Sequence, residues 1–463
     1  MSRLRQAGVV GAVFTLLAAC NFAPHYVQPP PSVPEAWPTG PAYAPNSPGT
    51  AGLPWRQVFT DPRLQTVIAR ALDSNQNLAA TVANVEASRA IFRAERSTLL
   101  PTIGGSASAS VAALRTGNAR SSSVPLQAGV GITSFTLDLF GRKRNLTRQA
   151  FEQYLATDAG YRSARITLIG AVATSYATLA SDRDLLAIAR QTLNSTATTL
   201  ALERQLLNAG LASRTDVANV ETVYAVARSD VANQTTLIAQ DKNALELLVG
   251  GQVEDALLPA SLSDLDRSVA VVPAGLSSRI LLQRPDVRQA EHVIRANNVN
   301  IGAARAAFFP DISLTALAGV ASRGLVSLFT DPSFAVTAAP SLAVPILGGP
   351  TRANLDLARA DQRAAVAQFR YTVQTAFREV ADGLARRGTI VEQRAARAED
   401  VAASTTAYQL LTQQYQAGIG TFLDTLIAQR TAYAARQTQV TTTLTDIDNR
   451  VNLYQYIGAD DGR

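Results

Sequence analysis

Apolar and polar positions follow their most regular pattern between residues 281 and 312. Apolar residues stand seven positions apart there, at Val287, Ile294, Ile301 and Phe308. Alanines at positions 290 and 304 follow members of that series by three residues. This spacing is the a/d heptad of a helix that packs along one face, and Pro310 stops it. The pattern therefore predicts a coiled-coil-like helix that ends just before Pro310.

A weaker copy of this pattern stands 209 positions earlier. It keeps the same phase, with apolar residues at Leu78, Val85, Phe92 and Leu99. It also keeps the continuation, since Pro101-Thr102-Ile103 matches Pro310-Asp311-Ile312. Unrelated helices can share a heptad, but they would rarely share both the terminating proline and the residues after it. The chain is therefore predicted to be a tandem duplication of one large structural unit.

Each heptad helix precedes two short segments with strand character. They cover 103–114 and 126–140 in the first repeat, around a polar loop at 115–125, and 312–320 and 334–344 in the second. Apolar residues at 312, 314, 316 and 318 alternate with Ser313 and Thr315. About ten residues suffice for a tilted strand to cross a bilayer. The pattern therefore predicts two candidate transmembrane strands per repeat.

Long helices complete each repeat. The first helix is expected over 61–100, and a second over 142–208, which is roughly 100 Å long. It breaks at Ala209-Gly210 and restarts at Ser213, a Ser-x-x-Asp start signal ending at Asp216. The break at Ala417-Gly418 and the restart from Thr421 to Asp424 lie 208 positions later. Each repeat thus reads helix, strand, strand, long helix, turn, helix.

The fold class that these elements predict is an α+β membrane protein. No mature segment has eighteen consecutive apolar residues, so a membrane crossing would use strands. Four strands cannot close a barrel, because the smallest barrels need about eight. A chain with transmembrane strands must therefore oligomerise, and a trimer would supply twelve. The expected domains are an arm at 20–60, repeat 1 at 61–275 and repeat 2 at 276–463.

The first nineteen residues resemble an export signal. Arg3 and Arg5 precede an apolar segment at 9–17, and Leu17-Ala18-Ala19-Cys20 resembles the lipobox of bacterial lipoproteins. That resemblance implies a diacylglycerol and an N-acyl chain on Cys20, the only cysteine, and Asn21 after it implies outer-membrane sorting. The alternative is a chance cysteine after an ordinary signal peptide. The following arm is rich in Pro, Gly and Ser.

Composition argues against several other functions. The net charge of +6 includes no dense basic run, so no nucleic-acid surface is indicated. His25 and His292 are the only histidines, and neither has a cysteine or carboxylate cluster nearby in sequence. No glycine-rich phosphate loop is present. We expect no metal, no other cofactor and no catalysis. Charged residues from Arg284 to Glu291 predict helix capping and salt bridges between the repeats.

Several further blocks resemble the TolC-like outer membrane factor family, specifically its NodT-type lipoprotein branch. They are Phe59–Leu64, Leu137–Arg142, Leu282–Glu291, Tyr415 with Gly418, and Ala428–Arg430. The likeness spans the mature chain. It implies a homotrimer with a 12-stranded outer-membrane β-barrel and a periplasmic α-helical tunnel. It also implies a passive exit duct of a tripartite efflux system, with a periplasmic adaptor and an inner-membrane pump of RND type as partners.

The same resemblance supplies candidate site residues. The family position matching Asp424 contributes to an acidic ring at the periplasmic constriction, and Tyr415 matches a tyrosine that helps keep the tunnel closed. Asp216 is the corresponding aspartate in repeat 1. Both aspartates also occupy capping-box positions, which is the alternative interpretation. The tip turns offer adaptor contacts, and their candidate residues are Gly210, Ser213, Arg214, Gly418 and Thr421.

This chain departs from the family pattern near the tip. Gln414, Gly420 and Ile427 stand where relatives carry charged residues, so the closed-state network is expected to be thinner. Two other functions stay open at this point. One is the outer-membrane duct of a type I protein secretion system. The other is a non-conducting coiled-coil periplasmic lipoprotein, which would leave the paired strand segments unexplained.

Overall fold

The computed structural model describes residues 21–43, 54–109, 112–116, 119–123, 126–271, 277–322, 330, 333–346 and 349–458. The predicted export signal and Cys20 lie outside this range. The chain divides into two compact units. Unit 1 comprises Met1–Pro30, Asn84–Asp158 and Gln289–Arg370, and unit 2 comprises Pro31–Ala83, Ala159–Arg288 and Tyr371–Arg463. Each unit contains segments of both repeats.

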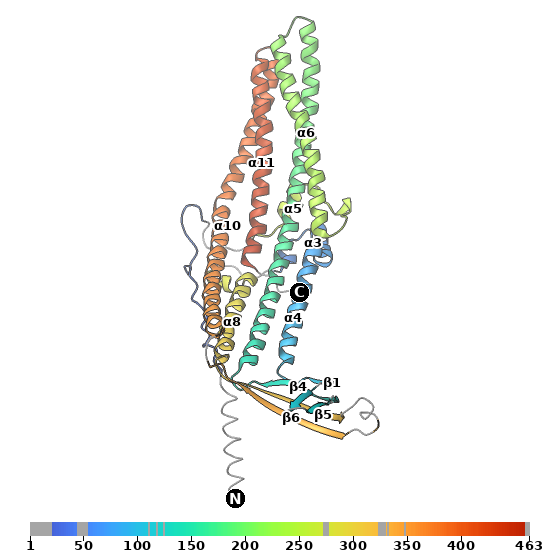
Figure 1. Ribbon diagram of the computed structural model, residues 1–463. Coiled ribbons are helices and arrows are strands. Elements are labelled where there is room, and N and C mark those ends of the chain that lie inside the picture. Colours follow the sequence, from blue (N-terminus) through green and yellow to red (C-terminus); the bar gives the residue numbers. More distant parts are fainter. Residues whose placement is uncertain are drawn as a thin grey trace. The chain divides into compact units, whose positions relative to one another are not determined.

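The helices of the two repeats match in order and length (Figure 1). The shortest pair has 22 residues each, the longest pair 67 and 66, and the last pair 36 each. In the same order, these pairs are α4 (Gln76–Ser97) and α8 (Pro285–Ala306), α5 (Arg142–Asn208) and α10 (Thr351–Gln416), and α6 (Arg214–Val249) and α11 (Phe422–Ile457). This correspondence agrees with the duplication expected from the heptads.

Unit 1 contains a four-stranded antiparallel sheet in the order β1-β4-β5-β6. The strands are β1 (Ile103–Ala109), β4 (Leu126–Leu137), β5 (Asp311–Ser322) and β6 (Ser333–Ala343). The last strand of repeat 1 therefore pairs with the first strand of repeat 2, for example through Val130 opposite Ala318. Strands β1 and β6 are the two edges of this sheet.

The register sorts the side chains into two chemically different faces. Residues that lie opposite one another share a face. One face carries Ile103 with Ile132, Leu314 with Pro340, and Val320 with Phe334. The residues next to these in sequence point to the opposite face of the sheet. That second face carries mostly Gly, Ser, Thr and Ala, such as Ser313 opposite Ser341. The sheet is amphipathic across its thickness.

Two strand expectations need correction. Strands β2 (Ala112–Thr116) and β3 (Ala119–Ser123) pair with each other, so the predicted loop at 115–125 contains strand. The segment predicted as one strand at 103–114 contributes to two different sheets. Strand β4 ends at Leu137, three residues before the expected end at 140. The cause is Asp138, whose carboxylate accepts the backbone N–H groups of Lys143 and Arg144 and so begins α5.

The single helix expected over 61–100 is also wrong. It is divided into α3 (Pro62–Ser74) and α4, with Asn75 in extended conformation between them. The Asn75 side chain accepts a hydrogen bond from the N–H of Leu78 and donates one to the carbonyl of Leu248, both at 2.8 Å. A heptad cannot reveal this break, because the asparagine finds its partner on α6, far away in sequence.

The core of unit 2 joins α3, α5, α6 and α11 to the connector between the repeats. Buried Tyr176 of α5 donates its hydroxyl to the carbonyl of Leu257, at 2.8 Å. Phe59 packs edge-on against Tyr454 of α11, with ring centroids 5.5 Å apart. Helix α7 (Leu262–Ser268) contributes Leu262 and Leu265 to the same core. The connector is thus an integral layer of this unit.

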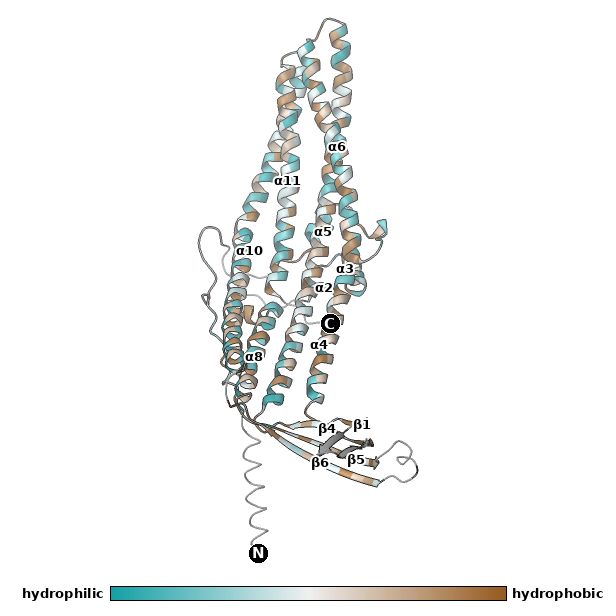
Figure 2. Cartoon of the chain, in the orientation of Figure 1, coloured by the Kyte–Doolittle hydropathy of each residue, from teal (hydrophilic) through white to brown (hydrophobic). Residues whose placement is uncertain are grey.

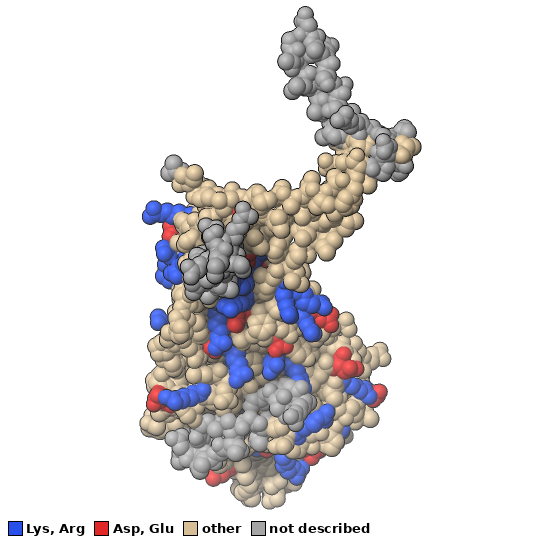
Figure 3. Space-filling model, turned by 90° about the horizontal axis from the view of Figure 1, so that it is seen from below, with Lys and Arg blue, Asp and Glu red and all other residues tan. Residues whose placement is uncertain are grey.

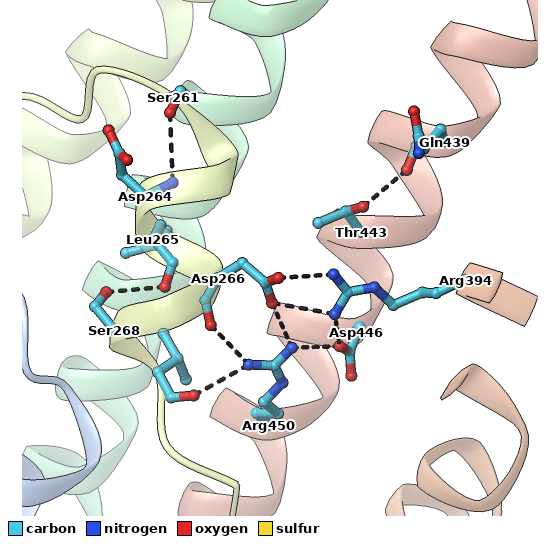
Figure 4. Close-up of polar contacts among 11 residues, drawn as sticks. Ser261, Asp264, Leu265, Asp266, Ser268, Arg394, Gln439, Thr443, Asp446 and Arg450 are labelled. Carbon is cyan, nitrogen blue, oxygen red and sulfur yellow. Dashed lines mark hydrogen bonds and ion pairs between the residues drawn. The ribbon is translucent and has the colours of Figure 1, made fainter. Parts of the chain in front are cut away.

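Four charged residues fasten that connector to the second repeat (Figure 4). Asp266 of α7 pairs with Arg394 of α10 at 2.7 Å and with Arg450 of α11 at 2.5 Å. Asp446 of α11 pairs with both arginines. Burial alone would raise the pKa of Asp266, but hydrogen bonds from Arg394 and Arg450 outweigh it and lower that pKa. The two arginines therefore favour the charged form of Asp266 inside the fold.

The charged block at 284–291 has local partners. Buried Arg284 pairs with Asp286 at 2.7 Å and Glu379 at 3.0 Å and donates to the carbonyl of Tyr456 at 2.7 Å. These partners lie in the same repeat, so the expected bridge to the other repeat is not what Arg284 makes. Its ion pair with Glu379 instead joins the start of α8 to α10, and its hydrogen bond to the Tyr456 carbonyl joins it to α11.

Hydropathy along the helices is mixed (Figure 2). Within the part of the chain that the structure describes, none of the helices is both long and apolar enough to cross a bilayer.

Candidate functional site at the helix-hairpin tips

Two matching turns end the long helices of unit 2. Residues 209–213 join α5 to α6, and we call these two helices with their turn hairpin 1. Residues 417–421 join α10 to α11 in the same way, and we call this pair with its turn hairpin 2. Gly210 and Gly418 adopt positive φ angles of 74° and 76°, a conformation that disfavours residues with a Cβ. In both turns the glycine N–H and the next N–H bond back to the helix carbonyls.

The two candidate aspartates cap the helices that follow these turns. Asp216 and Ser213 form a full capping box, and the Asp216 N–H donates to the Ser213 hydroxyl at 3.1 Å. Thr421 donates its hydroxyl to Asp424 at 2.5 Å and accepts the Asp424 N–H at 3.2 Å. The capping interpretation therefore describes the observed geometry. A gate role for either aspartate stays a prediction.

Tyr415 joins the two hairpins. Its hydroxyl donates to the Oε1 of Glu203 on α5 at 2.8 Å, and its ring lies 5.2 Å from that of Phe422. Burial, followed by the hydrogen bond to Glu203, raises the pKa of Tyr415 to about 12. The phenol therefore stays protonated and keeps donating at any physiological pH.

Glu203 was not among the sequence candidates, although it is completely buried. A signal for it exists, because Leu200, Glu203 and Leu207 are spaced by three and four residues, and this places an acid in an apolar helix stripe. A buried carboxylate needs a strong donor, and the Tyr415 hydroxyl supplies one. Glu203 therefore belongs with Tyr415 as one functional pair.

Three further contacts connect the hairpins away from the tip. Tyr433 of α11 donates to Asp230 of α6 at 2.6 Å, and burial with this bond raises the pKa of Tyr433. Gln429 donates to Thr196 at 3.3 Å, and Arg436 donates to Gln191 at 3.3 Å. Separating the hairpins would therefore break Tyr433–Asp230 as well as Tyr415–Glu203.

The remaining tip candidates lie on the surface. Gly210, Ser213, Arg214, Gly418 and Thr421 are all exposed, as is Asp424. The turns also expose large apolar side chains, with Leu211 75% and Ile419 79% accessible. Gly420 has a packing reason, since a Cβ there would lie 3.1 Å from the backbone nitrogen of Tyr415.

No group of His, Cys, Asp and Glu within the described residues is arranged to hold a metal ion. His292 contacts Glu152 through Nδ1 at 2.7 Å, a pairing that no spacing along the chain predicts.

The chain matches the family model described as outer membrane efflux protein over residues 67–251 and 276–459. It therefore belongs to the outer membrane efflux protein family, and its location is the cell outer membrane.

Individual relatives agree with this assignment. The chain is 41% identical to the toluene efflux pump outer membrane protein TtgI of Pseudomonas putida, covering 96% of each chain. It is 34% identical to outer membrane protein OprJ of Pseudomonas aeruginosa, covering 90% of this chain and 88% of OprJ. Its fold resembles the open-state MtrE outer membrane channel of Neisseria gonorrhoeae, with a TM-score of 0.84 and 33% identity over 95% and 99% of the two chains. The chain is thus an outer-membrane efflux channel protein whose structure is mostly helical.

Proposed function

We propose that this chain is the passive exit duct of a tripartite pump for small molecules. It acts as a homotrimer, carries acyl chains on Cys20, and has no catalytic activity of its own. A periplasmic adaptor engages the paired tip turns, and an inner-membrane pump of RND type supplies the energy. The relative TtgI is named as part of a toluene efflux pump, and this supports a small-molecule cargo for this chain. That named function favours a pump over a protein secretion duct.

The sheet supports the trimer. Strands β1 and β6 have no partner on their outer edges within the described sheet. Unpaired backbone groups are costly in lipid, so the edges need neighbouring strands. Three copies would supply twelve strands, enough for a closed β-barrel with the apolar face outward. A non-conducting coiled-coil lipoprotein would have no use for such a sheet.

The observation that carries the proposed gate is the Tyr415–Glu203 contact between hairpins 1 and 2. Opening by separation of these hairpins must break it and expose a buried carboxylate. The intact contact therefore favours the closed tip. Asp424 is exposed at the same end, and three copies of it would focus a negative potential that attracts cations.

Planar-bilayer conductance tests this function. We expect the purified wild-type protein to form a small, cation-selective pore. Tyr415→Phe should raise the open probability at least about tenfold, because a hydrogen bond to a charged group contributes about 1.5–3 kcal/mol. Glu203→Gln should act in the same direction, and Asp424→Ala should lower the preference for cations.

Tyr371→Phe is the matched control, because Tyr371 also lies on α10 but its side chain is 64% exposed. It should behave like wild type. A protein that never forms a pore, even with Tyr415→Phe, would refute the duct. A pore that ignores Asp424→Ala would leave that residue with helix capping alone.

A further inference from the structure

Basic residues gather where the helices of unit 1 meet the sheet. Segments 93–100, 138–148, 305–311 and 349–359 hold nine Lys and Arg but four Asp and Glu. Strands β1, β4, β5 and β6 each adjoin one of the helices α4, α5, α8 and α10, all at the same end of the sheet. The ends of these helices therefore meet along one edge of the sheet, which is formed by the strand ends. Figure 3 shows more Lys and Arg than Asp and Glu on the side of the molecule that is seen from below.

We define the basic collar as six of these residues: Arg93, Arg96, Arg142, Lys143, Arg148 and Arg352. Among the described residues, no ion pair occupies Arg93, Arg96, Arg148 or Arg352, and all four side chains are exposed. Three of the four carboxylates in these segments already form ion pairs, one of them with Arg142 of the collar. Asp138 pairs with Arg144, Asp311 with Arg142, and Asp356 with Arg359. The collar therefore keeps a net positive charge.

Helix stability explains only part of this charge, because Arg96 lies in the last turn of α4, where the helix dipole favours a cation. Helix α5 begins with Arg142, Lys143 and Arg144, and Arg352 lies in the first turn of α10. The helix dipole is positive at these ends and disfavours cations there by about 0.3–1 kcal/mol each. An external anion would offset this cost, since both the side chains and the helix ends attract it.

The N-terminal arm reaches the same edge of the sheet. Phe22 stacks on Phe309 with centroids 4.6 Å apart, and Arg305 donates to the Phe22 carbonyl at 3.0 Å. Ala23 lies so close to Gly302 that a Cβ on Gly302 would come within 2.6 Å of the Ala23 nitrogen. The arm therefore contacts this edge at Phe22, two residues after Cys20, the proposed site of acylation.

We propose that the basic collar binds the anionic headgroups of phospholipids in the membrane leaflet that the acyl chains enter. The apolar face of the sheet begins at this edge, with Ile103 and Leu342 directly beyond the collar. Cations beside an apolar wall match a phosphate above its acyl chains. This inference rests on the proposed insertion of the sheet in the membrane.

Spin-labelled lipids test the collar in vesicles that contain the full-length protein. The wild-type protein should enrich spin-labelled phosphatidylglycerol over phosphatidylcholine in its boundary layer, and about 0.5 M salt should weaken that preference. The combined change Arg93→Gln, Arg96→Gln, Arg148→Gln and Arg352→Gln should lower the preference about threefold or more.

Two matched variants guard against indirect effects. Replacing four exposed arginines of unit 2 (Arg190→Gln, Arg228→Gln, Arg386→Gln, Arg430→Gln) removes the same charge and should leave the lipid preference unchanged. Replacing the four collar arginines by lysine keeps the charge and should also preserve it. Equal loss in the unit 2 variant, or no loss in the collar variant, overturns the proposal.

Reversal potentials separate this inference from the proposed function. If the collar faces lipid, the collar variant should keep wild-type ion selectivity. A changed reversal potential with an unchanged lipid preference would show that these arginines line the pore, and the collar would be refuted while the duct stands. Absence of any pore in the wild-type protein would instead count against the duct.

Discussion

Acids with little access to water have shifted pKa values in this fold, and Asp182 and Asp241 form one such pair. These carboxyls, on α5 and α6, contact each other, and burial first and then the charge of Asp182 raise the pKa of Asp241 to about 6. A raised carboxyl pKa favours the protonated form in the fold. Its stabilising contribution is therefore present at acidic pH and is lost as pH rises through about 6.

Asp241→Asn should consequently stabilise the protein at neutral pH and have little effect at a pH well below the ordinary carboxyl range. The gain should be about 1 kcal/mol, less than the full pKa shift implies, because Asp241 is only half-buried. Thermal unfolding in detergent at both pH values measures it, and exposed Asp73→Asn is the control. Equal effects at the two pH values would contradict a raised pKa of Asp241 in the folded protein.

At the same scale, the sequence reveals residue types more readily than partners. Tyr415 was identified by resemblance and Asp216 by its capping position, and both lie at the tip. Glu203 and Asp230 were missed, because each is defined by a tyrosine more than 200 positions away. Periodicity places a residue on a helix face, but it does not say which helix faces it.

Among the elements, the break at Asn75 is the place where the heptad predicts one continuous helix and the structure has two, α3 and α4. The Asn75 side chain satisfies Leu78 of its own helix and Leu248 of α6 at once. Asn75→Ala should destabilise the protein by about 1–3 kcal/mol, because it leaves a buried carbonyl and an uncapped N–H. The midpoint of thermal unfolding measures the loss. The control is Gln76→Ala at the exposed neighbouring position, which should change the free energy of unfolding by less than about 0.5 kcal/mol.

The hairpins themselves offer a second test between elements. Tyr433 and Asp230 form a contact separate from the Tyr415 pair, so a double-mutant cycle with Tyr433→Phe and Asp230→Asn should give a coupling of about 1–2 kcal/mol. Each single change should also raise the open probability in bilayers, though less than Tyr415→Phe does. Strict additivity of the two changes in unfolding midpoint would mean that the contact contributes nothing.

For the whole molecule, the sequence predicted the duplication, the lengths of the long helices α5 and α10 and the approximate positions of the four sheet strands. It did not predict their order. Pairing of β4 with β5 joins the repeats through a contact between strands separated by α5 and α6, and local pattern cannot specify such a long-range partner. The same limit explains the missed β2–β3 pair, whose Ser- and Arg-rich strands resemble a loop.

The two faces of the sheet give the sharpest test of the assembly. Val336 lies on the apolar face and Thr337, its neighbour on β6, lies on the other. Arginine facing lipid near the bilayer midplane costs about 2–4 kcal/mol, whereas a water-facing arginine costs little. Val336→Arg should therefore lower the yield of membrane-inserted trimer several-fold, measured by heat-sensitive migration of extracted protein, and Thr337→Arg should assemble as wild type does. If the effects were reversed, the apolar face would line the interior and the proposed barrel would be built inside out; if both variants assembled fully, these strands would not contact lipid at all.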